Sequence, residues 1–146
     1  MSCAFCSPET TKGRIIIENT FAFAFPTIAP IVPGHVLISP KRHAIYYEDL
    51  TFEEKDAIEE LRVQLKDALI KAFGAQGFNY AWNEEKIGGQ SVPHFHLHIL
   101  PRKEGDAGVY KYEPREFIYR TTPADERPNS SDDELRDIVS IIQKAL

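Results

Sequence analysis

The sequence contains no apolar run long enough to cross a membrane and no excess of basic residues. A transmembrane helix needs about 20 consecutive apolar residues. Lys and Arg number 17 against 22 Asp and Glu, which gives a formal net charge of −5. A negative net charge does not favour binding to the negatively charged backbone of a nucleic acid. A ligand that carries phosphate is therefore expected to be a small molecule, bound by a few hydrogen-bond donors at its site. These features predict a soluble protein whose partners include neither a membrane nor a nucleic acid.

Cysteine is scarce, and the two cysteines present, Cys3 and Cys6, are spaced C-x-x-C. At 146 residues the chain is long enough to bury a core without disulfides, so we expect a single domain covering residues 1–146. In a reducing compartment this spacing favours metal or redox chemistry over a structural disulfide. The first residues also lack the basic and apolar regions of a secretory signal, which predicts a cytoplasmic location.

Short β-branched and aromatic runs, separated by turn residues, predict an α+β fold with a mainly antiparallel sheet of about five strands. The first two runs are joined by Glu18-Asn19-Thr20 and are typical of a hairpin. Pro101 is expected to end the last strand, because proline cannot donate to a strand ladder. The candidate strands cover residues 13–18, 21–25, 34–39, 77–83 and 93–100.

One long helix is expected to pack on this sheet. Thr51 and Glu54 have the spacing of a capping box, and the residues that follow carry an apolar face at helical spacing. Gly74 supplies a stop signal. This pattern predicts a helix from Phe52 to Phe73.

The C-terminal part of the chain differs in composition from the part before it. The core that carries the motif described below covers residues 1–103, and residues 104–131 are polar and contain several prolines. They are expected to form a long loop or arm with one short strand at Glu116–Arg120. Ser131 begins a second capping-box spacing, which predicts a closing amphipathic helix over residues 132–146.

Histidine is concentrated in one apolar stretch. Three of the five histidines, His94, His96 and His98, occupy alternate positions between apolar residues. Alternate side chains of an extended strand share a face, so the three imidazoles are expected on one face while Phe95 and Leu97 pack into the core on the other. Packing alone does not account for three imidazoles in register.

Two kinds of chemistry use such a row of imidazoles. Alternate histidines on a strand can chelate a transition metal, although catalytic metal sites usually add a carboxylate or a further histidine from elsewhere. Alternatively, a neutral imidazole can attack phosphorus while its neighbours donate hydrogen bonds to the phosphate oxygens. The unperturbed pKa of imidazole, about 6.5, leaves the ring largely unprotonated near neutral pH and suits the second role.

The run from His94 to Leu100 resembles the signature of the histidine triad nucleotide-binding superfamily, His-φ-His-φ-His-φ-φ with φ apolar. The resemblance extends from Ile15 to Lys103. It is closest to the fragile histidine triad branch, which cleaves diadenosine polyphosphates, in the segments Pro33–Leu37, Gly89–Val92 and Leu100–Lys103. It implies the fold of that superfamily, a small nucleotide as ligand and, by analogy, a homodimer.

The resemblance also implies an activity. The expected enzyme is a hydrolase that cleaves dinucleoside polyphosphates or related nucleotide conjugates at the α-phosphate through a nucleotidyl-histidine intermediate. Alternatives are a nucleoside phosphoramidase, a nucleotidyltransferase or phosphorylase, and a regulator that binds nucleotide without catalysis. A further alternative is a metal-dependent enzyme that uses the triad itself as ligands.

Roles for individual residues follow from the same resemblance. His96 is the expected nucleophile, His98 contacts the phosphate oxygens, and His35 supports the triad. Three of the assigned residues have a structural alternative: His35 as a buried histidine bonded to a carbonyl, Asn83 as an amide that only caps a turn, and Gln90 as a side chain that only satisfies the loop backbone. Thr27 stands where the superfamily often has a carboxylate or Asn for the ribose hydroxyls, and is a weaker ribose partner. The expected substrate contacts are Asn83, Gln90, Ser91 and Thr27.

Cys3 and Cys6 resemble the N-terminal pair of zinc-bearing members of the superfamily, and His43 and His94 match the two further ligands of those members. Two thiolates and two imidazoles make a closed tetrahedral site, so the implied zinc is structural. It would pin the N-terminus to the strand that presents His96. The alternative is a pair of inert or redox-active thiols on a frayed terminus. The fragile histidine triad branch lacks this pair, so the sequence combines features of two branches, and no organic cofactor is implied.

Overall fold

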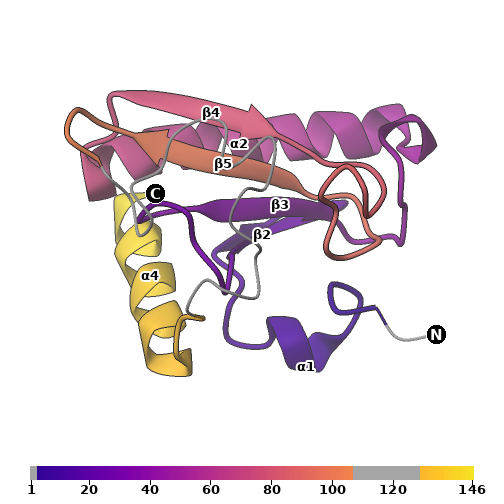
Figure 1. Cartoon of the computed structure of the whole chain (residues 1–146), viewed down its shortest axis with the longest axis horizontal. Helices are drawn as coiled ribbons and strands as arrows, with labels where there is room; N and C mark the ends of the chain where they lie inside the picture. Colours follow the sequence, from indigo (N-terminus) through magenta and orange to yellow (C-terminus); the bar gives the residue numbers. More distant parts are fainter. Residues whose placement is uncertain (1–2, 107–128) are drawn as a thin grey trace.

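A computed structural model describes residues 3–106 and 129–146 of the chain. These residues contain a five-stranded antiparallel sheet with the strand order β1-β2-β3-β5-β4. Figure 1 shows the last four of these strands side by side. The α+β fold and the antiparallel sheet predicted from the sequence are therefore confirmed. The strands are β1 Ile17–Glu18, β2 Ala22–Pro26, β3 Val36–Pro40, β4 Gly77–Ala81 and β5 Leu97–Arg102.

The long helix α2 runs from Phe52 to Phe73, as predicted. The Thr51 hydroxyl accepts from the Glu54 amide at 3.1 Å, and the Glu54 carboxylate accepts from the Thr51 amide at 2.9 Å, so both amides at the helix start are satisfied. Gly74 ends the helix with φ 68°, a left-handed conformation that glycine adopts readily.

Three further helical segments are present in the described residues. The closing helix α4, Asp132–Ala145, is capped by Ser131 and Glu134, which confirms the second capping box. The short helix α1, Pro8–Thr11, and the 3-10 turn η1, Tyr47–Asp49, are too short to show helical periodicity in the sequence. None of the helices in the described ranges is long and apolar enough to cross a bilayer.

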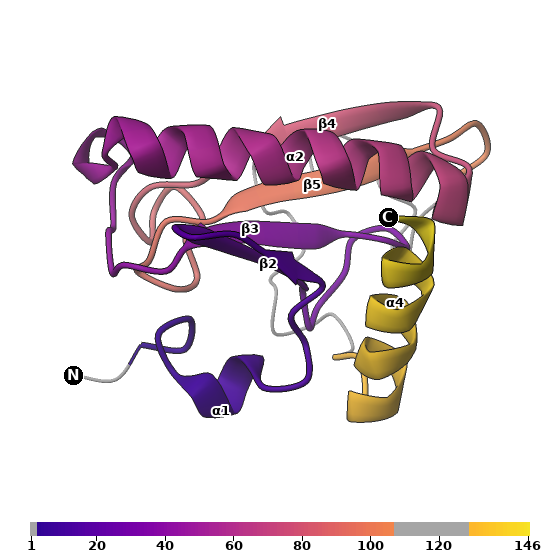
Figure 2. The same cartoon turned by 180° about the vertical axis from the view of Figure 1, so that it is seen from behind.

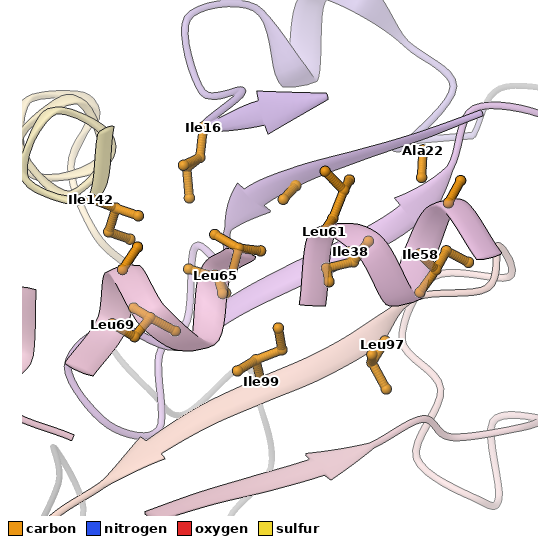
Figure 3. Packing of buried hydrophobic residues seen from close by; sticks show 14 of the residues in the cluster. Ile16, Ala22, Ile38, Ile58, Leu61, Leu65, Leu69, Leu97, Ile99 and Ile142 are labelled. Atoms are coloured by element: carbon orange, nitrogen blue, oxygen red, sulfur yellow. The ribbon is translucent and has the colours of Figure 1, made fainter. Parts of the chain in front are cut away.

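The main core lies between the sheet and these helices. Figure 2 shows α2 lying across one face of the sheet, with α4 beside its C-terminal end. Leu61, Leu65 and Leu69 of α2 pack against Ile38 of β3 and Ile99 of β5, and all five are at least 99% buried (Figure 3). Burying such a side chain contributes roughly 1.5–3 kcal/mol. Because this face of the sheet is committed to the core, alternate side chains of β5 must point to the opposite face.

The last strand differs from the prediction of residues 93–100. β5 begins at Leu97, so His94 and His96 precede it in extended backbone, where the Phe95 amide donates to the Ala44 carbonyl at 2.6 Å. The expectation that Pro101 ends the strand is wrong, since Pro101 pairs with Phe78. Among the described residues, β3 pairs with β5 only as far as Ile99, so at Pro101 the strand has one neighbour and its missing N–H is tolerated on the other side.

Smaller differences concern the other strands. β1 is limited to two residues, although the Ile16 amide extends its pairing by donating to the Ala24 carbonyl at 2.8 Å. β4 ends at Ala81, two residues before the predicted end, because the chain then enters the turn that leads to Gln90. The strand expected at Glu116–Arg120 lies outside the described residues.

Candidate active site

Four of the five histidines are buried on the side of the sheet away from α2 or at its edge. His98 lies between Leu97 and Ile99, which are both part of the core, so its ring points to the opposite face. The ring centroids of His96 and His98 are 4.9 Å apart, and those of His35 and His98 are 5.2 Å apart. The chain thus places three imidazoles in direct contact.

The hydrogen bond of His96 fixes its tautomer. Nδ1 of His96 lies 2.8 Å from the carbonyl oxygen of His94. A carbonyl can only accept, so in the neutral ring Nδ1 carries the proton and donates it, and Nε2 carries the lone pair. The backbone therefore presents His96 with its nucleophilic nitrogen on the far side of the ring from the peptide.

A chain of two hydrogen bonds fixes the tautomer of His98. The Ile31 amide donates to Nδ1 of His35 at 3.2 Å, so the proton of a neutral His35 resides on Nε2. That Nε2 donates to Nδ1 of His98 at 3.0 Å. Nε2 of His98 then carries the proton of that ring and is a donor. The site therefore combines a nucleophilic nitrogen on His96 with a hydrogen-bond donor on His98.

The turn that connects β4 to the histidines carries two of the predicted substrate contacts. Nδ2 of Asn83 donates to the Gly89 carbonyl at 3.3 Å, and the Gln90 amide donates to the Glu85 carbonyl at 3.0 Å. Gly88 is required within this turn, because a Cβ there would lie 2.1 Å from the Glu84 carbonyl oxygen. The turn thus holds Asn83 and Gln90 at its two ends.

The remaining polar candidates differ in burial. Gln90 is 91% buried, and within the described part of the chain its Nε2 has no hydrogen-bond partner. Ser91 is exposed. Thr27 is half-buried directly after β2, where its hydroxyl accepts from the Ala29 amide at 3.4 Å and its amide donates to the His35 carbonyl at 3.3 Å. Thr27 is thus tied to the residue that orients His98.

The predicted metal ligands come together at the edge of the site. One ligand atom from each of the four side chains lies within 4.8 Å of all the others. Sγ of Cys3 is 3.5 Å from Nδ1 of His94, and Sγ of Cys6 is 3.4 Å from Nδ1 of both His43 and His94. Bonds of about 2.3 Å to sulfur and about 2.0 Å to nitrogen in a tetrahedral zinc site place sulfur and nitrogen about 3.5 Å apart. The cluster therefore fits a zinc ion.

The protonation of His94 also fits a metal ligand. Nε2 of His94 donates to the Pro40 carbonyl at 2.8 Å, so the lone pair of the neutral ring is on Nδ1 and faces the sulfurs. Burial lowers the pKa of His94, the nearby His43 lowers it further, and the Pro40 carbonyl opposes the shift. Burial and the neighbouring Cys3 raise the pKa of the Cys6 thiol, an effect that a cation between the sulfurs would counteract.

The triad itself does not form such a cluster. Within residues 3–106 and 129–146, the group of Cys3, Cys6, His43 and His94 is the one set of His, Cys, Asp or Glu side chains whose ligand atoms converge on a metal position. Nδ1 of His96 is already bonded to a carbonyl. The geometry therefore separates His94, which faces the cysteines, from His96 and His98.

Two residues, one beside His96 and one beside the end of β2, were missed in the sequence. The ring of Phe5 lies 5.0 Å from that of His96 and 5.0 Å from that of Phe25. Its position between the two cysteines was the available signal. Arg14 donates to the Pro26 carbonyl at 2.8 Å and borders a cavity of about 460 Å³ that Ile28 and the start of α4 also line. No pattern in the sequence distinguished Arg14 from a surface arginine.

Comparison with known proteins gives consistent matches. A family model described as HIT domain matches residues 9–105. The chain is 31% identical over 119 residues to a bis(5'-adenosyl)-triphosphatase of Dictyostelium discoideum, covering 82% of this chain and 76% of that protein. It is 34% identical over 113 residues to an adenosine 5'-monophosphoramidase of Schizosaccharomyces pombe, covering 75% and 80%.

A solved structure resembles the whole chain. A Zn-bound histidine triad family protein from Mycobacterium smegmatis aligns with a TM-score of 0.67 and 27% sequence identity, covering 100% of this chain and 99% of that one. The match includes the N-terminal segment that carries Cys3 and Cys6.

Proposed function

The chain belongs to the HIT domain family, and on that premise we propose that it hydrolyses dinucleoside polyphosphates or related nucleotide conjugates at the α-phosphate. The observation that carries this proposal is which nitrogen bears the proton in His96 and which in His98. The lone pair of His96 is on Nε2, and the ring 4.9 Å away offers a proton donor on Nε2 of His98. A nucleophile beside a donor is what an attack on phosphorus requires.

In the first step, Nε2 of His96 attacks the α-phosphorus. A P–N bond forms as the P–O bond to the leaving group breaks, and the remaining phosphate chain departs with the electron pair. The carbonyl of His94 accepts from Nδ1–H of His96, which stabilises the positive charge that the ring acquires. Nε2–H of His98 donates to a phosphate oxygen.

In the second step, water attacks the nucleotidyl-histidine. A P–O bond forms, the P–N bond breaks, and the electron pair returns to Nε2 of His96 while the attacking water releases its proton to the solvent. The intermediate divides one difficult substitution into two easier ones. His35 acts through His98, because it keeps the donor proton on the side of the substrate.

The proposed substrate contacts are Asn83, Gln90, Ser91 and Thr27. A buried donor without a partner costs about 1–3 kcal/mol, and Gln90 carries such a donor within the described residues, which supports a ligand contact there.

The test is to trap the intermediate. Diadenosine tetraphosphate labelled at the α-phosphate should label the wild-type chain, and His96→Ala should neither label nor turn over while still binding adenosine monophosphate. Turnover without a labelled intermediate would reject the mechanism, and binding without turnover would favour a nucleotide-binding regulator. Product analysis with added phosphate separates hydrolysis from phosphorolysis, and a nucleoside phosphoramidate tests the activity named for the Schizosaccharomyces pombe relative.

We propose that the cluster of Cys3, Cys6, His43 and His94 holds a structural zinc ion. Four protein ligands complete a tetrahedral site and leave no position for substrate, so the ion would supply a tether between the N-terminus and the histidine segment. Metal analysis of the purified protein should give one zinc per chain, and Cys3→Ser should lose it. Wild-type protein without zinc would reject this part of the proposal.

We also propose that two chains form a homodimer. β4 is an edge strand of the described sheet, and exposed aromatic side chains lie beside it. The rings of Trp82 and Tyr47 stack at 4.9 Å and line a cavity of about 470 Å³, and both are about 40% exposed in the single chain. The molecular mass in solution, measured by light scattering, should be twice that of the chain; a mass of 16.6 kDa would reject the dimer.

A further inference from the structure

The backbone between the two cysteines delivers an aromatic ring to the triad. Phe5 meets the ring of His96 edge to face at 5.0 Å with an interplanar angle of 86°. On its other side it meets Phe25 at 5.0 Å, and Phe25 belongs to a buried cluster with Phe23 and Leu37. Phe5 therefore fills the space between the candidate nucleophile and the aromatic surface of β2.

The position of Phe5 depends on the residues that flank it. Residues 3–7 form a tight turn in which the amides of Cys6 and Ser7 both donate to the Cys3 carbonyl at 3.1 Å. The side chains of the two cysteines reach His43 and His94. Without an ion these contacts involve sulfur, which is a weak donor and acceptor. An ion would replace them by strong bonds on both sides of Phe5.

We propose that metal occupancy of the cysteine–histidine cluster controls nucleotide affinity at the triad, and that Phe5 transmits this effect as a positioning residue for His96. The inference rests on the proposed function, because it concerns regulation of that same site. With the metal bound, the turn holds Phe5 against His96 and limits rotation of its ring. With the metal removed, the turn loosens, the ring of His96 gains freedom and the edge of Phe25 is uncovered.

Thermodynamic linkage makes this coupling reciprocal. If the metal raises the affinity for a nucleotide by some factor, the nucleotide must raise the affinity for the metal by the same factor. A coupling of about tenfold is within the usual range for two linked sites. This reciprocity distinguishes a metal site that is coupled to nucleotide binding from a metal site that only stabilises the fold.

A second route between the two sites exists and has to be separated from the first. His94 is one of the cluster ligands, and its carbonyl accepts from Nδ1 of His96. If this peptide carried the coupling, the effect of the metal would not need Phe5. Phe5 also meets the ring of His94 at 5.9 Å, so a Phe5 variant separates the two routes only if it keeps the wild-type zinc content.

The experiment measures binding of adenosine monophosphate by calorimetry to zinc-loaded and chelator-treated chain. We expect the zinc-loaded chain to bind about tenfold more tightly, and zinc affinity to rise by the same factor in saturating adenosine monophosphate. Equal nucleotide affinity with and without zinc would overturn the inference. Circular dichroism establishes whether the chelated chain stays folded; if it does not, the zinc-loaded variants described next decide the question.

The decisive variant is Phe5→Ala. It should still bind one zinc per chain, bind adenosine monophosphate about tenfold more weakly when zinc-loaded, and show no effect of nucleotide on zinc affinity. Phe52→Ala makes the same chemical change at a side chain that is 83% exposed, and should behave like the wild type. A Phe5→Ala chain that keeps the full reciprocal coupling would assign it to His94 and reject the role of Phe5.

The two proposals can fail separately. Zinc-dependent binding of adenosine monophosphate without a covalent His96 adduct would keep this inference and reject the proposed chemistry. A covalent His96 adduct together with zinc-independent binding of adenosine monophosphate would keep the proposed chemistry and reject this inference.

Discussion

Nε2 of His35 lies 3.0 Å from Nδ1 of His98, and the Ile31 amide occupies the other nitrogen of His35. A backbone amide therefore determines which nitrogen of His98 carries a proton, two side chains away. In the proposed mechanism His98 contacts the substrate, and Ile31 and His35 act on the substrate only through it.

Replacing His35 should reduce turnover through His98. In His35→Ala the relay is broken, so His98 populates both tautomers and the donor on Nε2 is lost part of the time. We expect kcat for diadenosine tetraphosphate to fall about 10- to 100-fold with a smaller change in KM, the usual cost of losing a partner that orients a functional histidine. His35→Gln, whose amide can both accept and donate, should recover part of kcat. Equal activity of both variants and the wild type would contradict the relay.

Gln90→Leu should separate stability from binding. The buried Nε2 of Gln90 has no partner among the described residues, so removing it relieves a desolvation cost of about 1 kcal/mol. We expect the free energy of unfolding to rise by about that amount, while the affinity for adenosine monophosphate falls. Urea denaturation and calorimetry measure the two quantities. A less stable variant with unchanged nucleotide affinity would show that Gln90 serves only the loop.

Gly88→Ala should disturb the turn before the triad. A Cβ at this position would lie 2.1 Å from the Glu84 carbonyl oxygen, so the backbone must shift. We expect a loss of stability of about 1–3 kcal/mol and a raised KM, because the same turn positions Asn83 and Gln90. Ile87→Ala is a control on the same turn, since Ile87 is 99% exposed and should tolerate the change. Thermal denaturation and steady-state kinetics test both variants, and equal effects would refute the steric argument.

The ion pair at the start of α2 predicts a dependence of stability on pH. Hydrogen bonds from Arg42 lower the pKa of Glu54, with burial opposing and the Thr51 amide assisting. A carboxyl whose pKa is lower in the folded state stabilises the protein above its unfolded pKa, about 4.3, and loses that contribution as the pH falls through the folded value. Glu54→Gln should therefore be less stable by about 1–2 kcal/mol at pH 7.

The difference between Glu54→Gln and the wild type should shrink as the pH falls below about 4. Denaturation of both chains at pH 7 and pH 3 measures it. Glu53→Gln changes an exposed carboxylate in the same helical turn and should have little effect at either pH. If the difference in the free energy of unfolding between Glu54→Gln and the wild type were the same at both pH values, Glu54 would contribute through its shape and not through its charge.

The elements that the sequence predicted most accurately carry local signals at both ends. α2 begins and ends where expected, because Thr51, Glu54 and Gly74 each satisfy a specific backbone group. The start of β5 was misplaced, since alternation of polar and apolar residues continues through His94 and Phe95, where the backbone bonds to Ala44 and not to a strand. The ends of a strand are set by pairing with residues that are far away in the sequence, so the alternation of polar and apolar residues cannot locate them alone.

The same distinction applies to the site. The triad and the four cluster residues could be named from the sequence because their spacing is unusual, and the chain brings the cluster together as the resemblance implied. The proton positions on His96 and His98 could not be predicted, because they depend on the Ile31 amide and the His94 carbonyl. Phe5 was missed because one phenylalanine near a terminus has no periodic pattern.

His94 contributes its imidazole to the cysteine cluster and its carbonyl to His96. Anyone who redesigns this protein to work without a metal therefore cannot treat the two sites as independent modules. A metal-free version would have to keep residue 94 in its present backbone conformation by packing alone, or the proton of the neighbouring imidazole would lose its acceptor.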